Sequence, residues 1–182
     1  DQSYRTISCY PEAYPGAKTP NIDRLAAKGV RFTSAYNGSW CAPSRASILT
    51  GKQPWQLREA GTHASSFPND LNVYTSILRR AGYFVGLVGK GWGPGNFKIA
   101  GWENNPAGPV HGSKKLDPPH KGMSTIDYAG SFKEFLKQRP KDQPFCFWYG
   151  GTEPHRPYEQ GMGVKTGKKL EQVEVPPFLP DS

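Results

Sequence analysis

The sequence contains few cysteines, no long apolar run and no internal repeat. Its three cysteines are too few, and too odd in number, for a disulfide framework, and no C-x-x-C spacing indicates a zinc site. No stretch approaches the roughly 18 consecutive apolar residues that a membrane-spanning helix needs. These absences exclude a disulfide-stapled scaffold, a zinc-binding module of that type and an integral membrane segment.

Composition instead predicts a globular, loop-rich chain. Apolar residues make up 36% and aromatic residues 13% of the 182 residues, which argues against wholesale disorder. Glycine (21) and proline (18) together make about a fifth of the chain, just below the level of low-complexity sequence. The length fits one domain or part of a larger one. A net charge of +8 favours an anionic partner, with sulfated sugar, phosphate, nucleic acid and membrane surface all open.

Hydrophobic periodicity predicts alternating helices and strands, the pattern of an α/β fold. The expected strands are residues 30–36, 83–88 and 145–150, and the last is apolar enough to be covered on both faces. The expected helices are residues 19–29, with Thr19 as cap and Gly29 as stop, then 43–51, 73–80 and 126–139. Residues 96–123 lack periodicity and are predicted to form a long surface loop.

Three chemically capable side chains are predicted to gather at one edge of the sheet. Lys90 and His155 fall just past the ends of two expected strands, and Cys41 follows the first expected strand by a short loop. Functional groups collect on loops at the carboxyl ends of parallel strands. Cys41 also precedes a helix in which Arg45 lies one turn further on, so the helix dipole and the guanidinium would both favour a thiolate. The alternative is a small cysteine buried as a hydrophobe.

The amino-acid sequence around Cys41 is the most specific feature of the chain. C-x-P-S-R followed by A-S-I-L-T-G, residues 41–51, resembles the signature of the type I sulfatase family, in which this cysteine is oxidised to formylglycine after translation. Three further segments resemble the same family in the same order: KTPNIDRLAAKGVRFTSAY before the motif, AGYFVGLVGK around Lys90, and PHRPY around His155.

The resemblance implies an alkaline-phosphatase-like α/β domain, with a mixed, mostly parallel sheet flanked by helices, that hydrolyses sulfate esters or sulfamates of glycans. It implies four catalytic residues: Cys41, Arg45, Lys90 and His155. The hydrate of the aldehyde at position 41 would attack sulfur and later release sulfate by elimination. Arg45 would hold the hydrate, and Lys90 would bind sulfate and the nucleophile. His155 would contact sulfate or protonate the leaving group.

A divalent cation, usually calcium with magnesium possible, is implied in the same way and would be bound by oxygen ligands. Asp1 and the modified Cys41 would be two of its ligands, because Asp1 resembles the second of two adjacent aspartates that end the first strand in sulfatases. The first of these aspartates and a later Asp-Asn pair have no match in this sequence. Residues 1–182 are therefore expected to be the amino-terminal part of a single catalytic domain, without its first strand and carboxyl-terminal half.

Two features indicate a subgroup. Many sulfatases have a histidine two residues beyond the active-site lysine, whereas Gly91 and Trp92 follow Lys90 here. The GKGWGPG loop and the terminal VPPFLP are similar to the heparan N-sulfatase (sulfamidase) group. The resemblance thus favours a sulfated glucosamine of heparan or heparin type, a role in glycosaminoglycan degradation and maturation by the formylglycine-generating enzyme. By the same resemblance the compartment is exported or lysosomal, no nucleic acid is expected, and the oligomeric state stays open.

Three other residues are candidates for substrate binding. His63 lies in a polar loop, Trp92 (like Trp55) would stack on a sugar ring, and Arg156 would meet an anionic group on the sugar. Each has an ordinary alternative: a surface histidine, a tryptophan packed in the core, and a solvated charge.

Two rival functions stay open at the level of sequence. A phosphate or phosphonate hydrolase of the same superfamily would share the geometry, and competition between sulfate and phosphate substrates would separate the two. A catalytically dead basic module that binds glycan or nucleic acid would show salt-dependent binding without turnover.

Overall fold

The computed structural model describes residues 2–38, 40–120, 122–153, 155, 157–175 and 177–180. The chain divides into two units, each assembled from more than one segment. The first unit comprises Asp1–Ala35, Pro118–Ser124 and Glu153–Ser182, and the second comprises Tyr36–Asp117 and Thr125–Thr152. Among the described residues, no helix is both long and apolar enough to cross a membrane.

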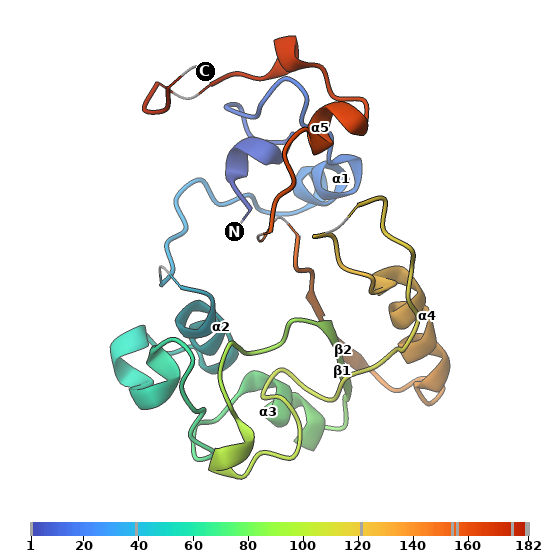
Figure 1. Cartoon of the computed structure of the whole chain (residues 1–182). Helices are drawn as coiled ribbons and strands as arrows, with labels where there is room; N and C mark the ends of the chain where they lie inside the picture. Colours follow the sequence, from blue (N-terminus) through green and yellow to red (C-terminus); the bar gives the residue numbers. More distant parts are fainter. Residues whose placement is uncertain are drawn as a thin grey trace. The chain divides into compact units, whose positions relative to one another are not determined.

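A parallel two-stranded sheet lies at the centre of the second unit (Figure 1). Strand β1 (Phe84–Gly89) pairs with β2 (Phe145–Gly150) in parallel, along their full length. Parallel neighbours need a long crossover connection, which here includes helix α4 (Tyr128–Gln138). Two of the three expected strands and the expected crossover helix are therefore confirmed.

Helices α2 (Cys41–Thr50) and α3 (Tyr74–Arg80) begin and end where local signals place them. Pro43 fits the first turn of α2, where the missing N–H has no partner to lose. Gly51 ends α2 in the left-handed conformation, with φ of 67°, and its N–H donates to Ser47 O at 2.8 Å. The helices expected in these two segments are confirmed, with boundaries shifted by one or two residues.

The side chains of β2 alternate between two packing layers because successive strand residues point to opposite faces. The rings of Phe147 and Tyr149 lie against α4, with centroids 4.9 Å from Phe132 and 5.2 Å from Tyr128. Trp148 points the other way and packs against the hydrophobic core. The buried members of that core are Ala42, Ala46, Leu49, Leu57, Ala60, Phe67, Leu71, Val73, Leu87, Trp92 and Ala107.

Strand β2 is not covered on both faces, contrary to the expectation from its apolar sequence. Phe145 is 42% and Tyr149 65% exposed. Within the described part of the chain, β2 pairs with β1 alone and is therefore an edge strand. Apolar content does not distinguish an edge strand from a central one, because that difference depends on pairing partners distant in sequence.

The segment expected to be a surface loop is partly built into the second unit. Ala107 is fully buried, and Val110 forms a parallel bridge with Leu87 of β1. The His111 N–H adds a hydrogen bond to Leu87 O at 2.8 Å. The prediction of a purely surface loop was wrong because isolated bridges leave no repeating pattern in the sequence.

Helix α1 (Pro20–Lys28) of the first unit begins after Thr19 and ends at Gly29, as predicted. The Thr19 hydroxyl does not cap it, however. That hydroxyl donates to Asp23 Oδ1 at 2.9 Å and accepts from the Ser8 N–H at 2.9 Å. The predicted side-chain cap was wrong because the neighbouring loop already uses the Thr19 oxygen.

The strand expected at residues 30–36 does not form. The segment contains no strand or bridge, and Val30, Phe32 and Tyr36 are 82%, 70% and 95% exposed. Alternating apolar residues make a strand only where a neighbouring strand pairs with them, and no described segment does so here. Cys41 therefore follows an extended loop and not a strand.

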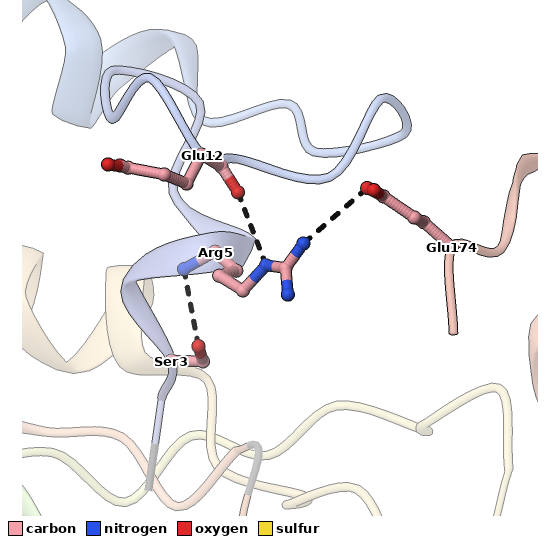
Figure 2. Close-up of polar contacts among 4 residues, drawn as sticks. All are labelled: Ser3, Arg5, Glu12 and Glu174. Carbon is pink, nitrogen blue, oxygen red and sulfur yellow. Dashed lines mark hydrogen bonds and ion pairs between the residues drawn. The ribbon is translucent and has the colours of Figure 1, made fainter. Parts of the chain in front are cut away.

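Arg5 connects two segments of the first unit, Asp1–Ala35 and Glu153–Ser182 (Figure 2). Its Nε donates to Glu12 O at 3.3 Å, and its Nη2 donates to Glu174 Oε2 at 3.5 Å. Its backbone N–H donates to Ser3 Oγ at 3.2 Å. These contacts attach the start of the chain to the tail that follows the short helix α5 (Met162–Lys165).

Candidate functional site

Cys41 is the first residue of α2 and is half-buried. Trp40 precedes it in extended conformation and gives the helix no side-chain cap. The Ser44 hydroxyl donates to Gly38 O, which ties the loop before Cys41 to the helix. Position 41 therefore lies at the positive end of the α2 helix dipole, an environment that favours negative charge.

Arg45, one turn along α2, reaches the loop that follows β1. Its Nη1 donates to Lys90 O at 2.6 Å and to Gly91 O at 3.0 Å. Burial lowers the pKa of the Arg45 guanidinium, and the charge of nearby Cys41 partly offsets this effect. The group stays charged because the ordinary pKa of arginine lies far above neutrality. The structure thus brings the Cys41 helix and the Lys90 loop together.

Lys90 has a firmly held backbone. Its N–H donates to Gly150 O at 2.7 Å, and its carbonyl accepts from Arg45 and, at 3.0 Å, from Trp148 Nε1. The side chain is half-buried, and in the described part of the chain no carboxylate pairs with its ammonium. An ammonium on a firmly held backbone, with no described carboxylate partner, is suited to bind an anion.

Glycines at the ends of β1 and β2 allow the backbones of the two strands to approach each other closely near Lys90. A Cβ on Gly150 would overlap Lys90 O, and a Cβ on Gly89 would overlap Gly150 O. Gly89 also has a φ of 74°, a conformation that residues with a Cβ seldom adopt. The end of the sheet that carries Lys90 therefore requires glycine on both strands.

Sequence reasoning missed Asn105, which holds the loop beyond Lys90. Its Oδ1 accepts from the N–H groups of Trp92, at 2.8 Å, and Ala107, at 3.0 Å. Its Nδ2 donates to Trp92 O at 2.9 Å. The side-chain amide thus both accepts from and donates to the loop backbone, as the peptide group of a neighbouring strand would. No local signal marks this role, because asparagine in a glycine- and proline-rich segment is typical of an ordinary turn.

Sequence reasoning also missed Trp148, whose indole N–H reaches the Lys90 carbonyl. A tryptophan inside an apolar strand is normally a packing residue, and Trp148 does pack against the core. The alternation of strand residues indicates which face it occupies but not which carbonyl lies within its reach.

Trp92 lies in the core. Its side chain is 3% exposed, and its ring centroid is 5.1 Å from that of Phe67 in an edge-to-face arrangement. A ring covered in this way has no free face for a sugar, so the structure supports the packing alternative for Trp92. Trp55, in contrast, is 80% exposed.

His63 lies beside the residue that precedes Cys41. Its ring centroid is 4.7 Å from that of Trp40, with an interplanar angle of 63°. His63 is exposed, and Trp40 is 60% exposed. The structure therefore places His63 near the amino end of α2, although the two are separated in sequence.

Three predicted site residues are not placed with this cluster. His155 is an exposed residue of the first unit, whereas Cys41, Arg45 and Lys90 belong to the second. Asp1 and Arg156 lie outside the described residues.

The described residues do not provide a complete metal site. Among them, no group of three or more His, Cys, Asp and Glu side chains is arranged to hold a metal ion. A calcium ion takes roughly six to eight oxygen ligands. Of the two implied ligands, Cys41 is described and Asp1 is not.

Known proteins resemble the chain over most of its length. The sulfatase family model matches residues 1–172. N-acetylglucosamine-6-O-sulfatase of Bacteroides thetaiotaomicron is 32% identical over 180 residues, which cover 90% of this chain and 31% of that protein. Human arylsulfatase A is 36% identical over 96 residues, which cover 50% of this chain and 18% of that protein.

The fold has a solved counterpart. A protein solved in complex with its substrate D-glucosamine-2-N,6-O-disulfate matches with a TM-score of 0.63 and 27% identity, covering 89% of this chain and 35% of that one. The likeness confirms the expected alkaline-phosphatase-like α/β fold. The chain spans about a third or less of the length of these relatives.

Proposed function

The chain belongs to the sulfatase family, and on that premise we propose that the whole protein hydrolyses a sulfate ester or sulfamate on a sulfated glycan. The observation that carries the proposal is the hydrogen bond from Arg45 Nη1 to Lys90 O at 2.6 Å, which joins the Cys41 helix to the Lys90 loop. Sulfate ester cleavage needs a nucleophile for sulfur and cations for the sulfate oxygens. Cys41 and Lys90 supply residues of both kinds in one unit.

The residues take the following roles in this proposal. Cys41 is converted to formylglycine by the formylglycine-generating enzyme, and the hydrate supplies an oxygen nucleophile. Lys90 binds the sulfate through its ammonium. Arg45 holds the hydrate with the part of its guanidinium not used on the Lys90 loop. His155 contacts sulfate or protonates the leaving group, as the family resemblance implies.

A divalent cation, calcium in most of the family, also belongs to the proposal. Asp1 and the modified Cys41 would be two of its oxygen ligands, and the ion would supply positive charge next to the sulfate.

Sulfated glucosamine is the substrate class that the comparisons support best. One relative is named as an N-acetylglucosamine-6-O-sulfatase, and the solved neighbour holds glucosamine with both N- and 6-O-sulfate groups. Such units are typical of heparan and heparin. The GKGWGPG loop, which resembles the heparan N-sulfatase group, makes the N-sulfate the first position to test.

The first test is mass spectrometry of the peptide from Trp40 to Lys52 in full-length protein produced with the formylglycine-generating enzyme. We expect a loss of about 18 Da at Cys41. The same protein, with calcium present, is then given glucosamine N-sulfate, glucosamine 6-sulfate and glucosamine 6-phosphate. We expect sulfate release from one or both sulfated sugars and little phosphate release.

Cys41→Ala is the control for the chemistry and should abolish sulfate release. An unmodified thiol on correctly matured protein would remove the aldehyde mechanism. Faster release of phosphate than of sulfate would favour the phosphate hydrolase, and salt-sensitive glycan binding without turnover would favour a binding protein.

A further inference from the structure

The Lys90 carbonyl accepts hydrogen bonds from side chains on two different elements. Arg45 Nη1 of α2 lies 2.6 Å away, and Trp148 Nε1 of β2 lies 3.0 Å away. We propose that Trp148 is a positioning residue that holds Lys90 where it contacts the sulfate. This inference rests on the proposed function.

The Trp148 indole is itself held in place. Trp148 lies opposite Leu87 in the register of the two strands, and it packs against the core. The ring of Tyr74, on α3, is stacked on it with centroids 6.5 Å apart and an interplanar angle of 25°. A ring restrained by a strand and a stacked neighbour presents its N–H in one direction, so it acts as a fixed donor to Lys90.

The same ring also supports the second donor. The Arg45 guanidinium carbon lies 5.7 Å from the centre of the Trp148 ring, within the range of a cation–π contact. Arg45, Trp148 and the Lys90 carbonyl therefore form three mutual contacts, here named the Lys90 clamp. Because each side chain of the clamp contacts the other, loss of the indole weakens both hydrogen bonds to Lys90.

A purely structural role is the alternative, since Trp148 also packs against the core. The N–H can be removed while the ring is kept, by replacing Trp148 with benzothienylalanine, in which sulfur stands in place of the indole N–H. Trp148→Phe is a simpler second variant. Trp102 is a matched control, because it is also half-buried and its Nε1 donates to a backbone carbonyl, Phe67 O, at 2.9 Å.

The experiment uses full-length, formylglycine-matured protein with sulfated glucosamine as substrate. We expect the Trp148 replacements to lower kcat/KM about tenfold, with a raised KM and a weaker inhibition by inorganic sulfate. The same replacements at Trp102 should leave kcat/KM within about twofold of the wild-type value. This holds even if the Trp102 variants and the Trp148 variants lose the same amount of thermal stability. Unchanged kinetics in the Trp148 variants, or equal losses at both positions, would overturn the proposal.

Hydrogen exchange separates this inference from the proposed function. The Lys90 N–H is bonded to Gly150 O, so a loosened clamp should speed exchange of that amide in the Trp148 variants and not in the Trp102 variants. Wild-type protein that turns over no sulfated sugar would refute the proposed function alone, provided that this difference in exchange is seen. Equal exchange in both sets of variants would refute the clamp.

Discussion

The Lys90 N–H and the Gly150 carbonyl are joined by a hydrogen bond of 2.7 Å at the point where both strands end. A Cβ on Gly150 would overlap the Lys90 carbonyl oxygen, which is backbone and has no rotamer to change. We expect Gly150→Ala to lower the free energy of unfolding by about 2 kcal/mol, measured by urea unfolding. Gly16→Ala is the control, because no atom lies within 4 Å of its Cβ position. Equal stability of the two variants would contradict the overlap.

Replacement of Arg45 by lysine keeps the charge but removes the planar group that reaches two carbonyls, Lys90 O and Gly91 O. We expect a loss of about 1–2 kcal/mol in stability together with a strong loss of activity. Arg58→Lys is the matched control, since Arg58 forms an exposed ion pair with Asp70 and should behave like wild type. Wild-type stability and turnover in Arg45→Lys would show that the charge alone is sufficient.

Asn105→Ala should destabilise the loop beyond Lys90, because two backbone N–H groups and one carbonyl lose their partner. We expect the free energy of unfolding to fall by about 2 kcal/mol, measured by urea unfolding at neutral pH. The neighbouring Asn104 is exposed, so Asn104→Ala should change stability by no more than about 0.5 kcal/mol. A comparable loss in the two variants would contradict a specific role for Asn105.

Lys90→Gln should reduce kcat/KM for the sulfated sugar by about 10²- to 10³-fold, as expected when a charged group that stabilises the transition state is removed. Because its side chain has no described carboxylate partner, the thermal melting temperature should change little. Steady-state kinetics alongside Lys98→Gln, at an exposed lysine of the short helix Lys98–Ala100, tests this. Retained turnover in Lys90→Gln would exclude Lys90 from the reaction.

Ionisation of Tyr74 makes the free energy of unfolding depend on pH in the alkaline range. Burial, and then the neighbouring Cys146, raises the pKa of the Tyr74 phenol from 10.0 to about 12. Between these two values the unfolded phenol loses its proton while the folded one keeps it, so the unfolded state binds fewer protons and the free energy of unfolding falls as pH rises. Burial also raises the pKa of the Cys146 thiol, which acts in the same direction. Urea unfolding from about pH 9 to 11 should show the decline, and a Tyr74→Phe variant should show a shallower one. An unchanged slope would contradict the assignment.

The elements that sequence predicted correctly depend on local signals. Pro43 and Gly51 mark the ends of α2, and the apolar runs of β1 and β2 follow turn residues. The strand expected at residues 30–36 failed because pairing depends on a distant partner.

The residues of the candidate site likewise fall into those that the sequence indicates and those that it does not. Cys41 and Lys90 lie in recognisable sequence motifs, and their side chains are of types that carry out the chemistry. Asn105 and Trp148 act through atoms that the fold brings to the Lys90 loop from elsewhere in the chain, so no spacing or periodicity could indicate them. The burial of Trp92 likewise depends on Phe67, which belongs to another segment.

Arg5 and Glu174, in contact within the first unit, are 169 positions apart in sequence. All segments of the second unit have been synthesised once Thr152 has been added. During translation the segments of the second unit are therefore complete while Asp1–Ala35 still lacks its partner segment Glu153–Ser182. The exposed apolar residues of Asp1–Ala35, Leu25, Val30 and Phe32 among them, are then present on a nascent chain in which chaperones and aggregation compete with folding.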